Sequence, residues 1–354
     1  MATATSTAVG DVVAGVAARP ARPRVSLSLR RLLLLYLVIP LALGLVVVDQ
    51  LVLDGSLRAA LPREPSHYLL FELVFGWPHI VASTIILATN GEYVAAYRRR
   101  LLVASAVITA FFTIGYFTLP YTVLFFVGAT ATIVHVLKQQ IGIGRGAART
   151  GSRIYGAWGW AAIATGVVLY NALFLQALDP YRPVLVPVAA ILAAITVWLA
   201  VRVHRDITSD LGHRFLWANT ALVASSFLFY LGGYGLLAIA VPRVVHDMTA
   251  FAFYVVHDAN KHGSGPRNSL HRLAARIPGG VFWVTPALAI VVAYLLSEHG
   301  DALVHLLSGG IVADAVPKPV SLGVLGYLGM MHYYYESFTW KSGSPYRPYI
   351  SMRA

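Results

Sequence analysis

Long apolar stretches separated by short charged segments dominate this sequence. Each stretch has roughly 18–25 residues, the length that a helix needs to cross the hydrocarbon core of a bilayer. Charged residues make up 12% of the chain, about half of the share that a soluble domain carries. We therefore predict an all-α fold, a polytopic integral membrane bundle of about ten transmembrane helices. The predicted spans are 32–53, 68–89, 101–118, 120–143, 155–177, 183–202, 215–239, 242–261, 279–297 and 319–338.

The distribution of basic residues gives this bundle an orientation. With ten spans, most of the 27 Lys and Arg residues fall on one side, for example the run Arg98–Arg100. Cytoplasmic loops carry such an excess, so we predict a cell-membrane protein with both termini cytoplasmic. A single helix broken at Pro120, in place of two spans, would invert everything downstream. The chain then divides into a disordered cytoplasmic arm (1–30), a transmembrane helical domain (31–340) and a cytoplasmic tail (341–354).

The net charge of +12 is explained by this topology. The lipid bilayer is therefore the expected partner, and a nucleic-acid partner has no support. Cysteine is absent, which excludes a disulfide framework, a thiolate nucleophile and a Cys-ligated zinc or iron–sulfur site. Histidine, in contrast, occurs twelve times. An ionisable side chain at the centre of a span costs about 2.5–3.5 kcal/mol on insertion scales, so histidines inside spans are candidates for function.

Three of the predicted spans place polar side chains one or two helical turns apart. In the second span, Glu72 and His79 are seven residues apart and share a helical face. Pro78 would free a backbone carbonyl there and loosen the helix. In the fourth span, His135 and Gln139 are one turn apart. In the tenth span, His332 and Glu336 have the i,i+4 spacing that lets two side chains converge on one ion.

The eighth span is richer still, because it contains two His-Asp pairs. The first is His246-Asp247 and the second is His257-Asp258, followed by His262. Since the two pairs are eleven residues apart, their histidines share a face but are separated by about 16 Å along the helix axis. They are therefore too far apart to bind one metal ion together.

Depth within the predicted spans sorts these residues into two layers. His79 is expected near the middle of the membrane, and the cytoplasmic halves of other spans hold His135, His257, His332 and Glu336. We predict that these five residues are metal ligands. Asp258 and His262, at the cytoplasmic mouth, would support the ligands or deliver protons, and Gln139 would orient a ligand or a bound water. A separate polar layer nearer the outer face would contain Glu72, His246 and Asp247.

Imidazole and carboxylate are the usual ligands of non-haem iron, and imidazole also suits copper and zinc. A helical bundle can hold such ligands on facing helices. We predict a metal-dependent membrane oxidoreductase with one or two non-haem iron ions, acting as an oxygenase on a lipophilic substrate from the bilayer. Copper and zinc stay open as alternatives. Chemistry of this kind also leaves room for an electron-transfer partner.

The histidine pattern resembles that of integral-membrane oxygenases. The element Gly76-Trp77-Pro78-His79, the chain length and the later histidines are similar to those of the Brp/Blh-type carotene dioxygenases. That resemblance implies a polytopic helical fold and a histidine-bound non-haem iron, and it does not carry carotene over as the substrate. The HxxxH and HxxHH boxes of membrane desaturases and alkane hydroxylases are absent from this sequence.

Two other classes of protein remain open at this stage. A membrane subunit that binds haem or quinone would use axial histidine pairs, although one haem needs fewer histidines than the spans contain. A proton-coupled transporter would use the polar residues as a relay between two sides of the membrane. The outer part of that relay would be Glu72, His246 and Asp247, and the inner part His257, Asp258 and Glu336.

Overall fold

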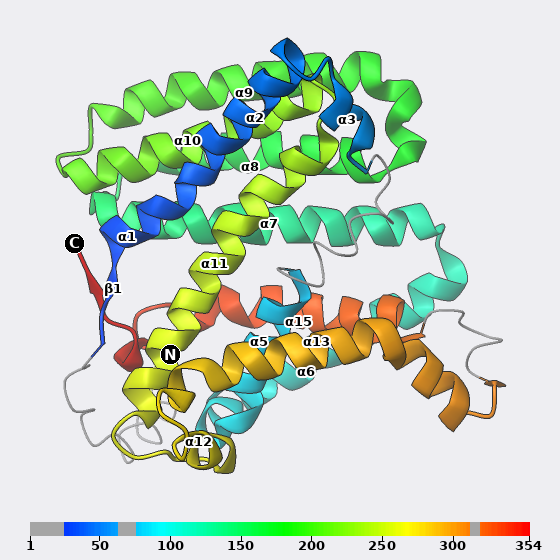
Figure 1. Cartoon of the computed structure of the whole chain (residues 1–354), viewed down its shortest axis with the longest axis vertical. Helices are drawn as coiled ribbons and strands as arrows, with labels where there is room; N and C mark the ends of the chain where they lie inside the picture. Colours follow the sequence, from blue (N-terminus) through cyan, green and yellow to red (C-terminus); the bar gives the residue numbers. More distant parts are fainter. Residues whose placement is uncertain (1–24, 63–75, 312–318) are drawn as a thin grey trace, which may run out of the picture.

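The computed structural model describes residues 25–62, 76–311 and 319–354, and these residues are almost entirely helical (Figure 1). Seven helices are long and apolar enough to cross a membrane. The all-α class is therefore confirmed, and the chain has the helices of a membrane protein. The seven are Leu29–Leu51 (α1, Leu29–Leu33; η1, Leu34–Leu37; α2, Val38–Leu51), α6 (Gly91–Thr118), α7 (Tyr121–Ala148), α8 (Arg153–Phe174), η4 with α9 (Gln176–Tyr181 and Arg182–His204), α11 (Gly235–His262) and α13 (Gly280–Leu307).

Further elements complete the described chain. Three of them, α5, α10 and α15, fall on predicted spans but are not among the seven long apolar helices. These elements are α3 (Ser56–Ala60), α5 (Trp77–Thr89), α10 (Asp210–Leu231), α12 (Ser269–Ala274), the π-helical turn η5 (Pro319–Val324), α15 (Leu325–Thr339), η6 (Arg347–Tyr349) and the two short strands β1 (Leu27–Ser28) and β2 (Met352–Arg353).

Helix boundaries differ from the predicted spans where glycine or proline interrupts the chain. Pro78 lies in the first turn of α5, a position where its missing N–H costs little. Residue 72 lies outside the described ranges. The predicted span 215–239 ends early, at Leu231, because Gly232 and Gly233 turn the chain and Gly233 has a φ of +80°. Around Pro120 there are two helices, as predicted, and not one broken helix.

Two groups of helices pack on either side of α11. Helices α7, α8, α9 and α10 form one group, and α5, α6, α13 and α15 form the other (Figure 1). Helix α11 crosses the molecule obliquely and contacts both groups, with α2 beside it. Its apolar window is 61% buried, against 17–50% in the other six candidate spans, so α11 is the central helix. Polar side chains on α11 therefore face protein on most sides.

The outer faces of the bundle remain strongly apolar. On α6, for example, Leu102, Val107, Ile114 and Phe117 are each 60–69% exposed. A surface with such a run of large apolar side chains is one that lipid covers, because soluble monomers rarely expose contiguous apolar patches of this size. This outer face agrees with the membrane bundle that the composition predicts.

The two ends of the described chain lie side by side. Strands β1 and β2 pair in parallel, with Leu27 opposite Met352. The Asn260 side chain, near the end of α11, hydrogen-bonds Val25 and the carbonyl of Tyr349. Both ends of the described chain therefore meet beside the end of α11. Residues 25–30, predicted as part of a disordered arm, form β1 and the start of α1, and the predicted tail 341–354 contains η6 and β2.

Candidate metal centre

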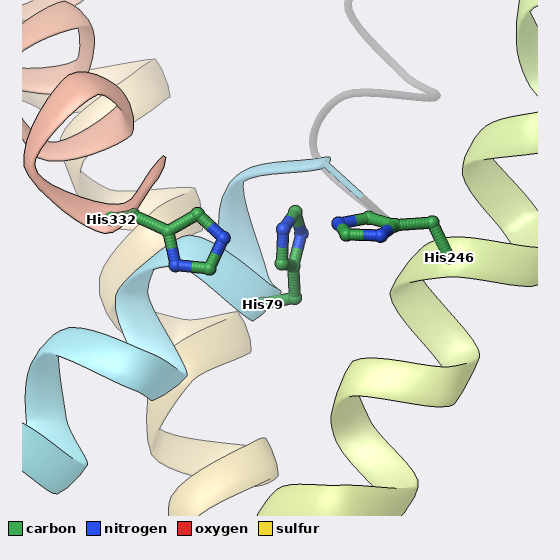
Figure 2. Close-up of side chains that lie close together, drawn as sticks. All are labelled: His79, His246 and His332. Carbon is green, nitrogen blue, oxygen red and sulfur yellow. The ribbon is translucent and has the colours of Figure 1, made fainter. Parts of the chain in front are cut away.

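Four helices each contribute one histidine to a single cluster where α11 meets both helix groups. The four are His79 of α5, His135 of α7, His246 of α11 and His332 of α15. The ring centre of His79 lies 5.1 Å from that of His246 and 4.9 Å from that of His332 (Figure 2). His135 is the fourth member of the cluster, because its ring centre lies 5.0 Å from that of His246 and 4.7 Å from that of His332. We call these four residues the four-histidine ring.

The spacing of the four-histidine ring suits a metal ion. Imidazole nitrogens at 2.0–2.1 Å from a common ion place ring centres about 4.6–5.3 Å apart, depending on the coordination geometry. Ligand nitrogens of His79, His246 and His332 lie within 4.8 Å of one another. The ligand-atom distances of three of the histidines therefore fit a shared ion, and so do the ring-centre distances of all four.

The ring is closed to water, and several of its nitrogens have no hydrogen bond. His79, His246 and His332 are at most 2% exposed, and the His135 side chain is 9% exposed. Among the described residues, Nε2 of His135, Nε2 of His332 and both nitrogens of His246 have no hydrogen-bond partner. Leaving a buried polar group unsatisfied costs about 1–3 kcal/mol. A cation at the centre of the ring would satisfy the lone pairs at once.

Glu336 adds a carboxylate to the ring, from the turn of α15 that follows His332. Its Oε2 atom lies 3.6 Å from Nε2 of His135 and 3.8 Å from Nε2 of His332. Ligand atoms of these three residues lie within 4.8 Å of one another. The site therefore includes two histidines and one carboxylate whose ligand atoms are close enough to share one ion.

Polar contacts outside the ring act on two of its histidines. The Ser83 hydroxyl donates to the Ile80 carbonyl at 2.7 Å, so its oxygen accepts from Nδ1–H of His332, also at 2.7 Å. Nε2 of His332 then has its lone pair toward the ring. The Asp247 carboxylate forms an ion-pair contact with Nδ1 of His79 at 3.1 Å, and its negative charge favours a proton on that nitrogen. Partners of this kind orient metal-binding histidines in proteins.

Glu336 is held in place by two further side chains. The Tyr254 hydroxyl donates to Oε1 at 2.5 Å, and the Gln139 amide donates to Oε2 at 3.4 Å. Gln139 thus contacts a member of the predicted ligand set. Sequence reasoning missed Ser83 as a functional residue, and it considered Tyr254 only as a residue that could line a substrate pocket. The signal was present in their spacing, since Tyr254 is two turns after His246 and Ser83 is one turn after His79.

The balance of charges around the ring favours a cation at its centre. Arg243 lies 3.8 Å from the Asp247 carboxylate, one turn away on α11, and offsets its charge. Glu336, whose side chain is 1% exposed, forms ion pairs only with histidines among the described residues. A buried carboxylate without a cation beside it is costly. A divalent metal would supply the missing positive charge.

The structure separates His257 from the other predicted ligands, which corrects the predicted ligand set. Both of its ring nitrogens have other partners, Nδ1 with Asp258 at 2.9 Å and Nε2 with the Tyr93 hydroxyl at 2.7 Å. His246, predicted in an outer layer, takes the place of His257 in the ring. The physical reason is the oblique course of α11, since depth counted along a tilted helix does not give depth in the bundle.

Of the other predicted site residues, Asp247 also belongs with the ring and not with an outer layer, and Glu72 lies outside the described residues. Asp258 and His262 form a second cluster, together with His271 of α12. Near this second cluster, Tyr346 stacks on Tyr93 with ring centres 4.0 Å apart. Burial raises the pKa of the Tyr346 phenol well above its ordinary value, so this ring stays uncharged.

We compared the chain with models of known protein families, with characterised proteins and with solved structures. None of the three comparisons gives a match. The resemblance to histidine-rich membrane oxygenases therefore still rests on the motif and histidine pattern of the sequence alone.

Proposed function

We propose that this protein is a membrane-embedded metalloenzyme that binds non-haem iron and oxidises a lipophilic substrate. The observation that carries this proposal is the four-histidine ring with the Glu336 carboxylate beside it. Five nitrogen and oxygen donors from four helices, without a thiolate, suit iron better than a structural zinc site, which is usually four-coordinate and often contains cysteine. Copper and zinc are the alternatives that metal analysis would distinguish.

A mononuclear centre fits the arrangement better than a dinuclear one. His332 belongs both to the group with His79 and His246 and to the group with His135 and Glu336. Its single lone pair, on Nε2, can bind only one ion. The two groups therefore describe two sides of one site.

The residues of the site have separate tasks in this proposal. The four histidines and Glu336 would bind the metal, and Asp247 and Ser83 would fix the orientation of two of the imidazoles. Tyr254 and Gln139 would hold the Glu336 carboxylate, and the Tyr254 hydroxyl would provide a proton that can move toward it. Iron, when bound, supplies the activation of dioxygen that protein side chains cannot perform.

A groove on the lipid-facing side supports a lipophilic substrate. It has a volume of about 400 Å³ and lies between α5, α6 and α15. Thr84 and Met331, which line it, directly follow Ser83 and precede His332 in the chain. Most of the other lining residues are apolar, so a hydrocarbon chain from the bilayer could occupy the groove beside the site. The lining residues are Thr84, Leu87, Ala88, Val94, Arg98, Leu101, Leu102, Ser105, Tyr327 and Met331.

The proposal is tested first by metal content and then by dioxygen uptake. Protein purified in detergent should contain about one iron per chain, and His332→Ala should remove it. His305→Ala, which changes an exposed histidine outside the candidate metal groups, should keep the iron. Reduced, iron-loaded protein should consume dioxygen when a lipid extract is added. A folded protein without metal, or full iron in the His332→Ala variant, contradicts the metal site, whereas iron without dioxygen uptake contradicts only the oxygenase.

One observation favours the transporter as a second candidate function. The polar residues of α11 form two clusters, with Asp247 in one and Asp258 in the other. Eleven residues separate them, which is about 16 Å along the helix and a distance that a proton relay would have to cover. A metal-free protein that transports protons into liposomes, and loses this flux in the Asp258→Asn variant, would favour that function over the enzyme.

A further inference from the structure

The second histidine cluster lies where α11 ends and the chain turns back through α12. It consists of Asp258 and His262 of α11 and His271 of α12. Asp258 lies eleven residues beyond Asp247, about 16 Å further along α11 than the four-histidine ring. The cluster is therefore a separate site. It does not depend on the function proposed above.

The local sequence brings these three residues together. Asp258 and His262 are four residues apart on α11 and project on one face. The helix ends at His262, and Asn268 caps the start of α12 by accepting the backbone N–H of His271. This cap turns His271 back toward the end of α11. A stretch of fourteen residues is thus sufficient to build the cluster.

The three side chains are buried and close enough to share an ion. Asp258 is 1% exposed, and His262 and His271 are fully buried. One ligand atom from each residue lies within 4.8 Å of those of the other two. The two imidazole rings stack with centres 3.8 Å apart and an angle of 15° between their planes. Imidazoles bound to one ion have ring centres further apart, about 4.6–5.3 Å, so the ring of His262 must turn out of this stack when the ion binds.

His271 and Asp258 meet as two hydrogen-bond acceptors. Nδ1–H of His271 donates to Oδ1 of Asn268 at 2.9 Å, which leaves the lone pair on Nε2. That lone pair lies 3.2 Å from Oδ2 of Asp258. Two acceptors at this distance need a positive charge between them, either a proton or a metal ion. Ligand atoms at 2.0–2.2 Å from a tetrahedral zinc ion are about 3.4 Å apart, which is close to the observed separation.

The outer contacts of Asp258 are those of a held ligand. Oδ1 accepts from Nδ1 of His257 at 2.9 Å, and Oδ2 accepts the Thr285 hydroxyl at 2.5 Å. Lys261, on the same helix, forms its ion pair with Glu92. Hydrogen bonds of this kind around a carboxylate orient it for a metal.

An unsatisfied nitrogen of His262 is a separate observation that points to a missing ion. Its Nε2 atom is buried and has no hydrogen-bond partner among the residues that the structure describes. Its Nδ1 atom accepts the backbone N–H of Arg267 over 3.3 Å, a long contact. A metal on Nε2 moves the ring proton to Nδ1, so this contact must open when the ion binds.

We propose that Asp258, His262 and His271 form a second cation site, for a divalent transition-metal ion of the zinc type. Two imidazoles and one carboxylate make up a set that zinc accepts, with a water in the fourth position. The ion binds α12 to the end of α11 and orders the turn 263–268. This site stabilises the end of the bundle and takes no part in oxidising a substrate.

The test uses the full-length, iron-loaded protein in detergent, titrated with Zn²⁺ or with Co²⁺ as a spectroscopic substitute. Wild type is expected to bind one zinc that His271→Ala loses, with the iron of the four-histidine ring unchanged. His246→Ala should give the reverse result. Since the two variants report separate sites, failure of one proposal is distinguishable from failure of the other.

Two further variants keep the test decisive. His213→Ala removes one ring of the surface pair His204–His213, whose ring centres are 4.1 Å apart without a carboxylate ion pair. It should bind zinc like wild type. Asp258→Asn keeps the shape of the side chain and should weaken zinc binding at least tenfold, even where His271→Ala folds poorly. Equal zinc binding by wild type and Asp258→Asn, or loss of the zinc only in His213→Ala, overturns the proposal.

Discussion

The two histidine clusters use the same kinds of residue but are assembled in different ways. The four-histidine ring takes one imidazole from each of α5, α7, α11 and α15, and its outermost members, His79 and His332, are 253 residues apart in the chain. The second cluster, Asp258, His262 and His271, comes from a single turn of the chain and its two flanking helices. One cluster therefore depends on how the whole bundle packs, whereas the other depends mainly on local capping.

This difference has a thermodynamic consequence. A metal in the four-histidine ring joins both helix groups to α11, so its binding is coupled to the folding of the entire bundle. A metal at the second cluster connects only α11 and α12, so its loss is expected to loosen one end. Substitutions that affect one cluster and spare the other test this separation.

The largest expected effect contrasts His246 and His257, two of the histidines of α11. His246→Ala removes a ring member and should lower the iron content to near zero. His257→Ala, on the same helix and equally buried, should leave the iron content unchanged, because both of its nitrogens have partners elsewhere. Elemental analysis of the purified variants measures both. If His257→Ala lost the iron and His246→Ala retained it, the originally predicted ligand set would be right.

A smaller but still large effect is expected from Glu336→Gln. This change keeps the size of the side chain and removes the negative charge next to His135 and His332. Iron affinity should fall by about 100-fold, since the amide is a weaker ligand and no longer offsets the charge of the ion. Competition with a chelator of known affinity gives the value. An unchanged affinity would show that Glu336 is not a ligand.

The next effect concerns the partner of His332. Ser83→Ala removes the oxygen that accepts Nδ1–H of His332 and should weaken iron binding by about 10–100-fold. Thr84→Ala is the matched control, because Thr84 also donates to the Ile80 carbonyl but has no contact with the ring. The same chelator competition applies to both. Equal weakening in the two variants would point to a general effect on α5.

The smallest expected effect falls on the second cluster alone. Thr285→Val keeps the approximate shape of the side chain and removes the hydrogen bond to Asp258. Zinc affinity should fall by about tenfold while iron binding stays the same. Thr249→Val is the control, because that buried hydroxyl bonds only to Val245 of its own helix. Zinc titration followed by iron analysis checks both expectations, and a joint loss of the two metals would mean that the clusters are coupled.

The sequence by itself determined the helices and part of each cluster. Apolar runs of spanning length gave helices at or near every predicted span that lies in the described residues, because burial of an apolar helix in lipid is decided by local composition. The i,i+4 pair His332 and Glu336 could also be predicted from local sequence, because helix geometry alone puts both side chains on one face. His79 and His135 were found as polar residues inside apolar spans.

Only the tertiary structure decided which residues share a site. Sequence spacing showed that His246 and His257 cannot bind the same ion, but it could not say which of them faces His79, because that depends on the tilt of α11 between the two helix groups. His271 lies in a short helix outside every predicted span, and only the Asn268 cap brings it to Asp258. Contacts between separate helices depend on crossing angles and on rotation about each helix axis, and neither quantity can be read from local composition.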